Sequence, residues 1–269
     1  MFGIAQIHWS ADPEIFRIGP VVLRWYSLCF LVTFVLGFFI VRRMFRLEGK
    51  SAKDLDSLVN HMVLGTVIGA RLGHCLFYDP VFYLTNPIEI FKIWRGGLAS
   101  HGAAIGIFAA LYLYSRNRPD QSYLWILDRI VVTVALGGFF IRIGNFFNSE
   151  IYGTATTLPW AIVFSHVDAV PRHPAQLYES FAYGLIFLLL YAVYSRQHDR
   201  TAPGLLLSLF LVSVFSFRVV VEFVKVRQAA YAHGFPLSVG QWLSIPLIIL
   251  GIVLLVYAQR TNRSKASTQ

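Results

Sequence analysis

The sequence is poor in cysteine, in metal-ligand motifs and in nucleotide-binding motifs. Its 269 residues include two cysteines, Cys29 and Cys75, and both fall within long apolar stretches. A disulfide framework is therefore not expected, and both thiols are interpreted as small apolar core residues. The eight histidines form no HExxH pair or Cys/His cluster, and no glycine-rich nucleotide loop occurs. We therefore expect no metal and no cofactor.

Charged residues are also scarce. They make up 14% of the chain, against about 25% in an average soluble domain. Hydrophobic residues reach 56% and the mean hydropathy is +0.59. A helix needs about 20 residues to cross a hydrocarbon core of about 30 Å, and the stretches that satisfy this are 20–41, 57–77, 98–115, 122–142, 178–195, 204–223 and 239–258. The sequence predicts an all-α polytopic membrane protein with seven transmembrane helices.

The first 19 residues do not resemble a removable signal peptide. They contain Asp12, Pro13 and Glu14 and lack a basic start, an apolar middle and a small-residue cleavage site. The first predicted span is therefore expected to serve as the insertion signal.

The net charge of +9 is distributed as a membrane orientation signal, and no nucleic-acid partner is expected. Basic residues follow predicted spans one, three, five and seven: Arg42, Arg43, Arg46, Lys50, Lys53, Arg116, Arg118, Arg196, Arg200, Arg260, Arg263 and Lys265. Fewer basic residues lie on the other side of the membrane: Arg17, Lys92, Arg95, Arg172, Lys225 and Arg227. By the positive-inside rule the N-terminus lies outside the cell membrane and the C-terminus lies in the cytoplasm.

The longest connection, residues 143–177, is expected to form a small extracytoplasmic cap between the fourth and fifth spans. Within it, Thr157 to Ser165 mixes β-branched and aromatic residues as a short strand does. The domain organisation expected is one transmembrane domain over residues 1–260, which includes this cap, and a frayed cytoplasmic polar tail over residues 261–269.

Several polar residues fall near the outer ends of the predicted spans: Arg24, Tyr26, Arg71, His101, Arg142, Arg218 and Glu222. An ionisable side chain inside a membrane is normally paired, near the interface or facing a polar cavity. For a single arginine, snorkelling or a structural ion pair is the simpler interpretation, and Arg218 and Glu222 are spaced to pair on one helix face. Several guanidinium groups at one depth favour an anionic headgroup, because each offers two parallel donors to a phosphate.

A specific motif begins at the end of the fourth span. The run Arg142-Ile143-Gly144-Asn145-Phe146-Phe147-Asn148-Ser149-Glu150-Ile151-Tyr152-Gly153 resembles the signature Gly-Arg-x-Gly-Asn-Phe-x-Asn-x-Glu-x-x-Gly of the prolipoprotein diacylglyceryl transferase family. It agrees at every fixed position except the first, where Ile141 stands. Further segments resemble the family in the same order: Ile18-Gly19-Pro20, Gly69-Ala70-Arg71-Leu72-Gly73, His101-Gly102, the run from Arg172 to Glu179, Phe217-Arg218 with Glu222, and Ser238 to Gln241. Two departures are Ala103, where a second glycine is common, and Lys225, where an arginine is expected.

The resemblance implies a reaction. The family joins the thiol of a lipobox cysteine in a prolipoprotein to the diacylglyceryl carbon of phosphatidylglycerol, which leaves a thioether and releases glycerol phosphate. By resemblance, Arg142 and Arg218 are expected to hold the phosphate. His101 is the leading candidate for the base that deprotonates the thiol, and Glu150 is expected either to act as the base instead or to orient an arginine.

The same resemblance implies a set of substrate-binding or site-shaping residues: Tyr26, Arg71, Asn145, Asn148, Gly153 and Glu222. Simpler interpretations stay open, since Tyr26 could be an interfacial aromatic residue and an asparagine at a span end could cap the helix. The run from Arg172 to Glu179 could anchor the fifth span or join the site. The expected location is the bacterial inner membrane, with the site near the outer leaflet.

One alternative function is a transporter for an anionic phosphate ester, because a cavity lined with arginines could bind and release such a solute without chemistry. A transporter needs a polar path to both sides of the membrane. The basic cluster is confined to the outer half, and no inverted repeat is visible, so the enzyme is the favoured interpretation.

Overall fold

The structure is a computed structural model that describes residues 7–19, 21–226 and 237–266. Pro20 and Arg227 of the sequence analysis lie outside the described residues. The chain divides into two compact units, Met1–Val41 with Asp128–Gln269, and Arg42–Leu127. Each unit is described by itself.

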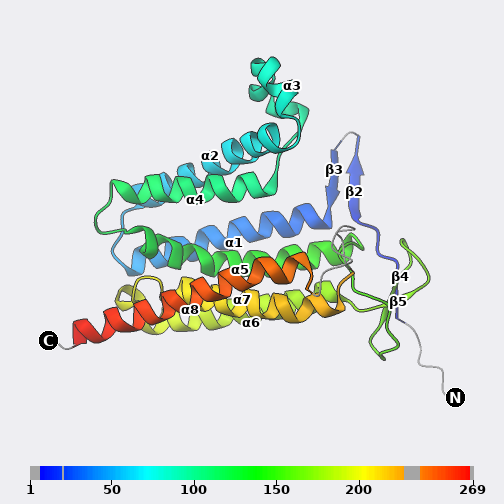
Figure 1. The fold of residues 1–269 in the computed structure, drawn as a ribbon. Coiled ribbons are helices and arrows are strands. Elements are labelled where there is room, and N and C mark those ends of the chain that lie inside the picture. Colours follow the sequence, from blue (N-terminus) through cyan, green and yellow to red (C-terminus); the bar gives the residue numbers. More distant parts are fainter. Residues whose placement is uncertain (1–6, 20, 227–236, 267–269) are drawn as a thin grey trace. The chain divides into compact units, whose positions relative to one another are not determined.

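The first unit consists of long apolar helices and short strands (Figure 1). Its helices are the first part of α1 (Trp25–Leu47), most of α5 (Tyr123–Phe147), α6 (Ala175–Gln197), α7 (Leu205–Val221) and α8 (Val239–Ala266). Helix α7 packs against both α6 and α8. Residues 261–266, expected to belong to a frayed tail, continue α8 as regular helix.

Each stretch predicted to span the membrane lies largely in a helix. Among the described residues, five helices are long and apolar enough to cross a membrane: Trp25–Leu47, Tyr123–Phe147, Ala175–Arg200, Leu205–Val224 and Val239–Asn262. The stretches 57–77 and 98–115 form α2 (Ala52–Phe77) and α4 (Ser100–Arg116). Helix α4 has only 17 residues. The polar residues Asn60, His61 and Arg71 interrupt the apolar sequence of α2. The chain is therefore a multi-pass membrane protein with at least five spans.

The prediction that the first span begins at residue 20 is wrong. Strand β2 (Glu14–Ile18) pairs antiparallel with β3 (Val21–Arg24), and α1 begins only at Trp25. Gly19 has a positive φ of 58° in the turn between the strands, a conformation that glycine adopts at little cost. β-branched Val21 and Val22 favour the strand, so their hydrophobicity belongs to a hairpin and not to the span.

A second small sheet follows α5. Its order is β1 (Ile7–Trp9), β4 (Ile162–Phe164) and β5 (Pro171–Arg172), with β1 parallel to β4 and β4 antiparallel to β5. The sheet packs its buried side chains on the end of α5 in a cluster of Phe146, Ile162, Phe164, Trp9 and Tyr152. The strand predicted within residues 157–165 is thus confirmed as β4, and the N-terminal segment supplies its unexpected partner.

The start of α7 is set by a buried carboxylate. Asp128 of α5 accepts hydrogen bonds from the backbone N–H of Gly204, at 2.7 Å, and of Leu207, at 2.8 Å. The first N–H groups of a helix have no partner within the helix, and an anion there also meets the positive end of the helix dipole. Asp128 is fully buried, so it caps α7 from inside the helix bundle.

The second unit is built on α2 and α4, with α3 (Pro80–Thr85), η1 (Pro87–Phe91) and η2 (Ile93–Arg95) between them. Glycines let the two helices pack backbone to backbone. A Cβ atom added to Gly69 would lie 2.7 Å from the Cα of Gly106, and one added to Gly73 would lie 2.6 Å from the Cα of Gly102. Small residues serve this purpose in membrane helix pairs.

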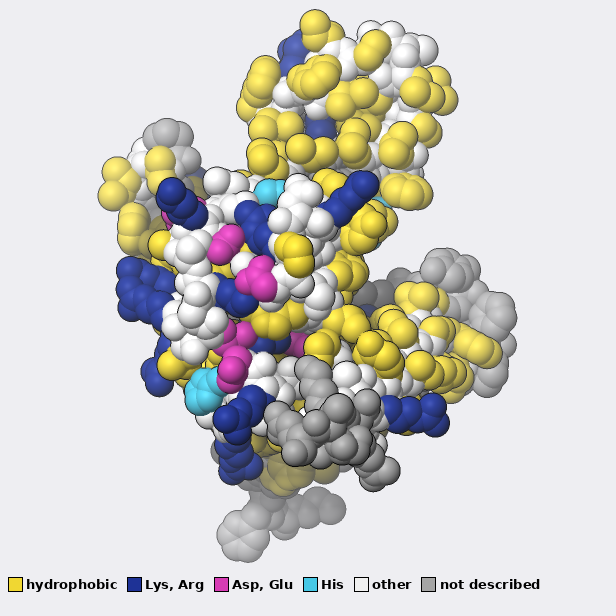
Figure 2. Space-filling view, turned by 90° about the vertical axis from the view of Figure 1, so that its left-hand side faces the viewer, with side chains coloured by type: hydrophobic (Ala, Val, Ile, Leu, Met, Phe, Trp, Pro, Cys, Tyr) yellow, Lys and Arg dark blue, Asp and Glu magenta, His cyan; other side chains and the backbone are white. Residues whose placement is uncertain are grey.

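Large apolar side chains cover much of the surface, as the face in Figure 2 shows. Phe34 of α1, Leu188 of α6 and Val253 of α8 are 57%, 60% and 60% exposed. Soluble proteins rarely expose so much contiguous apolar surface. The exposed faces of these helices are therefore lipid-facing.

We predict that Gly69→Ala weakens the second unit. Alanine gains about 1 kcal/mol in helix propensity, but its methyl group meets backbone atoms that cannot move aside, and such overpacking costs about 1–3 kcal/mol. Gly37→Ala is the control, because a Cβ there lies 3.5 Å from the Thr133 side chain, an ordinary contact. Denaturant unfolding in detergent should show a loss for Gly69→Ala and none for Gly37→Ala; equal effects would contradict the close packing.

Candidate active site

The end of α5 carries a chain of polar side chains. Arg142 donates from Nη1 to Oδ1 of Asn145 at 3.1 Å, and Asn145 donates from Nδ2 to Oε1 of Glu150 at 2.7 Å. Asn148 also donates to Oε1 of Glu150, at 3.3 Å. The structure therefore brings four of the predicted site residues together, with Asn145 as the link between the arginine and the carboxylate.

A strained turn directs Glu150 back toward the helix. Ser149 and Ile151, on either side of it, have positive φ values of 52° and 59°, which is uncommon for non-glycine residues and costly for a β-branched one. The turn is held by the backbone N–H of Glu150, which donates to the Asn145 carbonyl at 3.1 Å, and by Gln176, which donates to the Glu150 carbonyl at 2.7 Å. Strain of this kind is typical of functional sites.

Glu179 of α6 joins two cations from other elements. Its Oε2 lies 3.1 Å from Nε of Arg142, and both of its oxygens lie 3.4 Å from Nζ of Lys225, which follows η4 (Glu222–Val224). The Glu179 side chain is 2% exposed, and those of Arg142 and Lys225 are 15% and 11% exposed. The carboxylate thus holds Arg142 by one nitrogen while Asn145 holds it by another.

Arg218 and Glu222 lie close to this group. Burial lowers the pKa of Lys225; Glu179 and Glu222 oppose that shift, whereas Arg142 and Arg218 add to it. Tyr183 of α6 interacts with Arg142, Glu179 and Arg218. Three cations therefore gather at the adjoining ends of α5, α6 and α7.

The expected ion pair between Arg218 and Glu222 is not formed between these two described residues. Helix α7 ends at Val221, and Glu222 begins a 3-10 turn while its N–H still donates to the Arg218 carbonyl. The carboxylate of Glu222 lies instead against α8: a Cβ atom added to Gly240 would lie 2.9 Å from each of its oxygens.

Two glycines of the motif allow close approach. Gly153 donates its N–H to the His173 carbonyl at 2.9 Å and forms a β-bridge with Lys225; a Cβ there would lie 2.6 Å from that of His173. A Cβ on Gly144 would lie 2.9 Å from the Tyr26 ring. Gly153 thus fixes the segment that carries Lys225, and Gly144 makes room for Tyr26 beside α5.

Buried polar atoms without partners surround Glu150. Within the described residues, Oδ1 of Asn148, Oγ of Ser149 and Oε1 of Gln176 are buried and have no hydrogen-bond partner. Such atoms are rare in folded proteins, and each calls for an explanation such as a ligand contact. They make this part of the site suited to a ligand rich in hydroxyl groups.

Arg71 and His101 belong to the second unit. Arg71 is buried, and its guanidinium donates to the carbonyls of five residues of the loop before α4: Glu89, Ile90, Lys92, Gly96 and Gly97. In this structure Arg71 organises that loop, and its substrate contact stays a prediction. His101, in the first turn of α4, is exposed and stacks on Tyr78 with ring centroids 5.8 Å apart.

Comparison with known proteins agrees with the motif. Residues 13–257 match the family model described as prolipoprotein diacylglyceryl transferase. The chain belongs to the prolipoprotein diacylglyceryl transferase family. Three relatives are each named phosphatidylglycerol–prolipoprotein diacylglyceryl transferase. The one from Chloroherpeton thalassium is 51% identical, covering 93% of this chain and 94% of its own. Those from Tolumonas auensis and Porphyromonas gingivalis are 45% and 40% identical, covering 95% and 94% of this chain and 98% and 95% of theirs.

Sequence reasoning about this transferase missed Glu179, Gln176 and Tyr183 as site residues. Gln176 and Glu179 lie within the run from Arg172 to Glu179 that resembled the family, but that run was also compatible with an anchor for the fifth span. A stronger signal was available, because an acidic residue inside an apolar span is itself a sign of a functional partner. Tyr183 carried no such signal, since the chain has 13 tyrosines.

We predict that Glu179→Gln destabilises the first unit, because it leaves two partly buried cations without their anion. Breaking a buried ion pair costs about 3–5 kcal/mol, and the retained amide oxygen places the expected loss near the lower end. Asp168→Asn is the control: it removes the more exposed Asp168–Arg172 ion pair, at 2.6 Å, and should cost less than about 1 kcal/mol. Equal losses in denaturant unfolding would contradict the central place of Glu179.

Proposed function

We propose that this diacylglyceryl transferase carries out its reaction at the cluster around Arg142, using phosphatidylglycerol and the lipobox cysteine of a prolipoprotein. The names of its relatives include phosphatidylglycerol and prolipoprotein. The observation that carries the placement is the double hold on Arg142, by Glu179 at Nε and by Asn145 at Nη1. A guanidinium fixed in this way is a preorganised anion ligand.

The ion pairs of the cluster leave one arginine available to a phosphodiester. Glu179 pairs with Arg142 and with Lys225, whereas Arg218 forms no ion pair with another described residue. A phosphodiester carries one negative charge and can accept two parallel N–H bonds from a guanidinium. Arg142 and Arg218 are therefore proposed as the phosphate ligands, with Lys225 held against Glu179.

The chemistry is a displacement at carbon. The thiolate sulfur of the prolipoprotein cysteine forms a bond to the terminal diacylglyceryl carbon as the bond from that carbon to the phosphate oxygen breaks. The electron pair leaves with the oxygen, so glycerol phosphate is the product and the arginines meet its growing charge. The thiol, whose ordinary pKa is about 8.5, must first give its proton to a base.

Two residues are proposed for that base, as the sequence indicated. Glu150 is exposed and accepts hydrogen bonds from Asn145 and Asn148. His101 is exposed at the start of α4, and an imidazole titrates near neutral pH. Glu150 retains its alternative role of orienting Arg142 through Asn145.

The glycerol headgroup is proposed to lie near Glu150. The free acceptor atoms of Asn148, Ser149 and Gln176 can receive hydrogen bonds from its hydroxyls. Tyr26, Gly153 and Glu222 shape the same region through their contacts with Gly144, His173 and Gly240. Arg71 supports the loop before His101.

We further propose seven spans, an inner-membrane location, an extracytoplasmic cap and a site near the outer leaflet. Helices α5 and α7 end at the cluster and α6 begins there, so one end of the first unit carries the site. The basic residues Arg42, Arg196 and Arg260 lie at the other ends of α1, α6 and α8. Positive charge marks the cytoplasmic side, which puts the cluster on the outer side.

We predict that Arg142→Lys folds normally but loses turnover by about 100-fold or more, the usual effect of removing one preorganised donor. A lysine ammonium cannot bond both Glu179 and Asn145 and still present a planar fork to the phosphate. The measurement is release of glycerol phosphate and the mass of a lipobox peptide incubated with phosphatidylglycerol. A wild-type rate in this variant would remove Arg142 from phosphate binding.

We predict that Lys225→Arg extends activity to higher pH. Because burial lowers the pKa of Lys225, this lysine loses its charge at a lower pH than an ordinary lysine, and Glu179 then loses one cation. The activity of the wild type should therefore fall as the pH rises through the pKa of Lys225. The arginine of the variant stays charged, so its activity should persist to higher pH. Lys92→Arg is the control, at a lysine paired with Glu89 in the second unit, and should leave the pH profile of activity unchanged. If activity of Lys225→Arg fell at the same alkaline pH as that of the wild type, the role proposed for Lys225 would be contradicted.

A further inference from the structure

A long groove runs along the second unit between α2 and α4. Its volume is about 870 Å³ and residues of these two helices line all of it. The floor is formed by Gly65, Gly69, Gly73, Gly102 and Gly106, the same glycines that bring the helix backbones together. The glycines thus serve the contact between the two helices, and the apolar side chains beside them line the open part of the groove.

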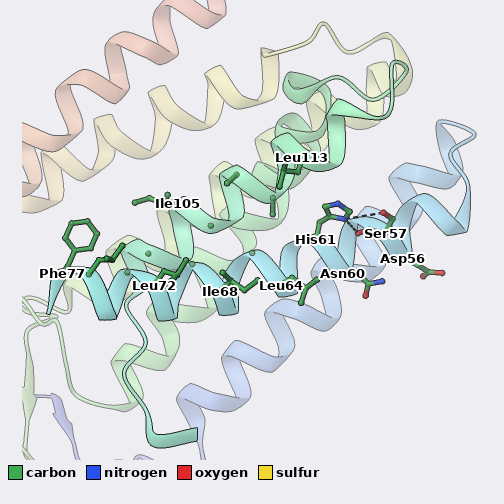
Figure 3. Close-up of a pocket in the computed structure, with 18 of the residues that line it drawn as sticks. Asp56, Ser57, Asn60, His61, Leu64, Ile68, Leu72, Phe77, Ile105 and Leu113 are labelled. Atoms are coloured by element: carbon green, nitrogen blue, oxygen red, sulfur yellow. Dashed lines mark hydrogen bonds between the residues drawn. The ribbon is translucent and has the colours of Figure 1, made fainter. Parts of the chain in front are cut away.

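The groove changes from polar to apolar along its length. Figure 3 shows Asp56, Ser57, Asn60 and His61 at one end and the apolar side chains from Leu64 to Phe77 along the rest. Residues 64–77 of α2 span about 20 Å at 1.5 Å per residue. Ile105, Ala109 and Leu113 of α4 form the opposite wall of the groove.

This length distinguishes between occupants. A full transmembrane helix needs about 30 Å of apolar contact, more than the groove provides. The apolar core of a secretory signal peptide has about 7–15 residues and follows a basic segment, so as a helix it covers about 10–22 Å. The groove matches that order, with a polar end and then about 20 Å of apolar wall.

The polar end also offers a partner for positive charge. Asp56 is exposed and forms no ion pair among the described residues, whereas its neighbour Asp54 is occupied by Arg118 at 3.0 Å. Asn60 and His61 lie on the next turn toward the apolar part. Lys53 also lines this end, so the end carries one charge of each sign, and the Asp56 carboxylate is the group with which the basic segment of a signal peptide can pair.

We propose that this groove binds the apolar helix of the prolipoprotein signal peptide, with its basic segment beside Asp56. The proposal rests on the proposed function, which supplies the substrate. The groove is thus a binding site for the protein substrate, separate from the residues assigned to the phosphate.

The direction of binding places the reacting thiol. The lipobox cysteine follows the apolar segment and therefore lies at the Phe77 and Gly102 end of the groove. His101 is the residue before Gly102, and its ring lies 5.6 Å from that of Phe77 and 5.8 Å from that of Tyr78. His101 therefore stands at the end of the groove where the thiol is placed, which suits its proposed role as the base.

The test fills the groove without disturbing the helix pair. Ala109 and Ala104 are both exposed on α4, but only Ala109 lines the groove; five residues apart, they lie about 140° from each other around the helix. The full chain is assayed in phosphatidylglycerol nanodiscs with a peptide that carries a complete signal sequence and lipobox. Ala109→Phe should raise the KM for the peptide about 10-fold or more and leave the KM for the lipid unchanged, while Ala104→Phe should match the wild type.

An unchanged peptide KM in Ala109→Phe overturns the proposal. A raised KM for phosphatidylglycerol alone also overturns it, because the groove would then hold a lipid chain. Should Ala109→Phe not fold, a photocrosslinking residue at Ile105 replaces it: capture of the peptide supports the proposal, and capture of lipid alone refutes it. The proposed function is judged separately, since wild-type protein that forms no thioether refutes that function whatever the variants do.

A charge reversal tests the direction. Asp56→Lys should raise the KM of a peptide with a basic segment about 10-fold, and a peptide whose basic residues are replaced by glutamates should restore binding. Loss of binding for both peptides, or for neither, would contradict the placement of the basic segment beside Asp56.

Discussion

The site depends on the carboxylate of Glu179. It is buried, and the two cations that it holds come from elements far apart in the chain, Arg142 at the end of α5 and Lys225 beyond α7. An uncompensated charge in such surroundings is costly, so the three side chains stabilise one another's positions. Arg142 in turn holds Asn145, and Asn145 holds Glu150. One buried anion thus fixes a chain of groups that would otherwise be free to turn.

This arrangement explains why a catalyst without a nucleophile of its own can work in a membrane. The attacking sulfur belongs to the substrate, so the protein must supply fixed charge, shape and a base. Preorganised donors in a site poor in water need little rearrangement as charge develops. The strained turn at Ser149 and Ile151 serves the same end, because it holds Glu150 against the helix end before any substrate binds.

Much of the fold was predictable from hydrophobicity, because a lipid environment demands long apolar helices with internally satisfied backbones. The motif from Arg142 to Gly153 also predicted which residues gather at the end of α5. Pairings between distant segments were not predictable. The parallel pairing of β1 with β4, and the use of Val21 and Val22 in a hairpin, depend on partners that local hydrophobicity does not reveal.

The same limit applies to individual charges. Arg71 and Arg142 looked alike as arginines inside apolar stretches. The structure separates them, since Arg71 donates to backbone carbonyls of one loop while Arg142 is held by side chains and lies beside Arg218. The contacts made by each guanidinium therefore distinguish an arginine that organises a loop from one that is proposed to bind the phosphate.

The most direct test of this account is the stoichiometry of one reaction. Purified wild-type chain is incubated with vesicles of phosphatidylglycerol and a lipobox peptide, and glycerol phosphate and thioether-linked peptide are measured together. The account predicts that the two products appear in equal amounts and that both disappear when the lipobox cysteine is replaced by serine. Peptide modified without release of glycerol phosphate, or movement of a phosphate ester across the vesicle membrane without any thioether, would contradict it.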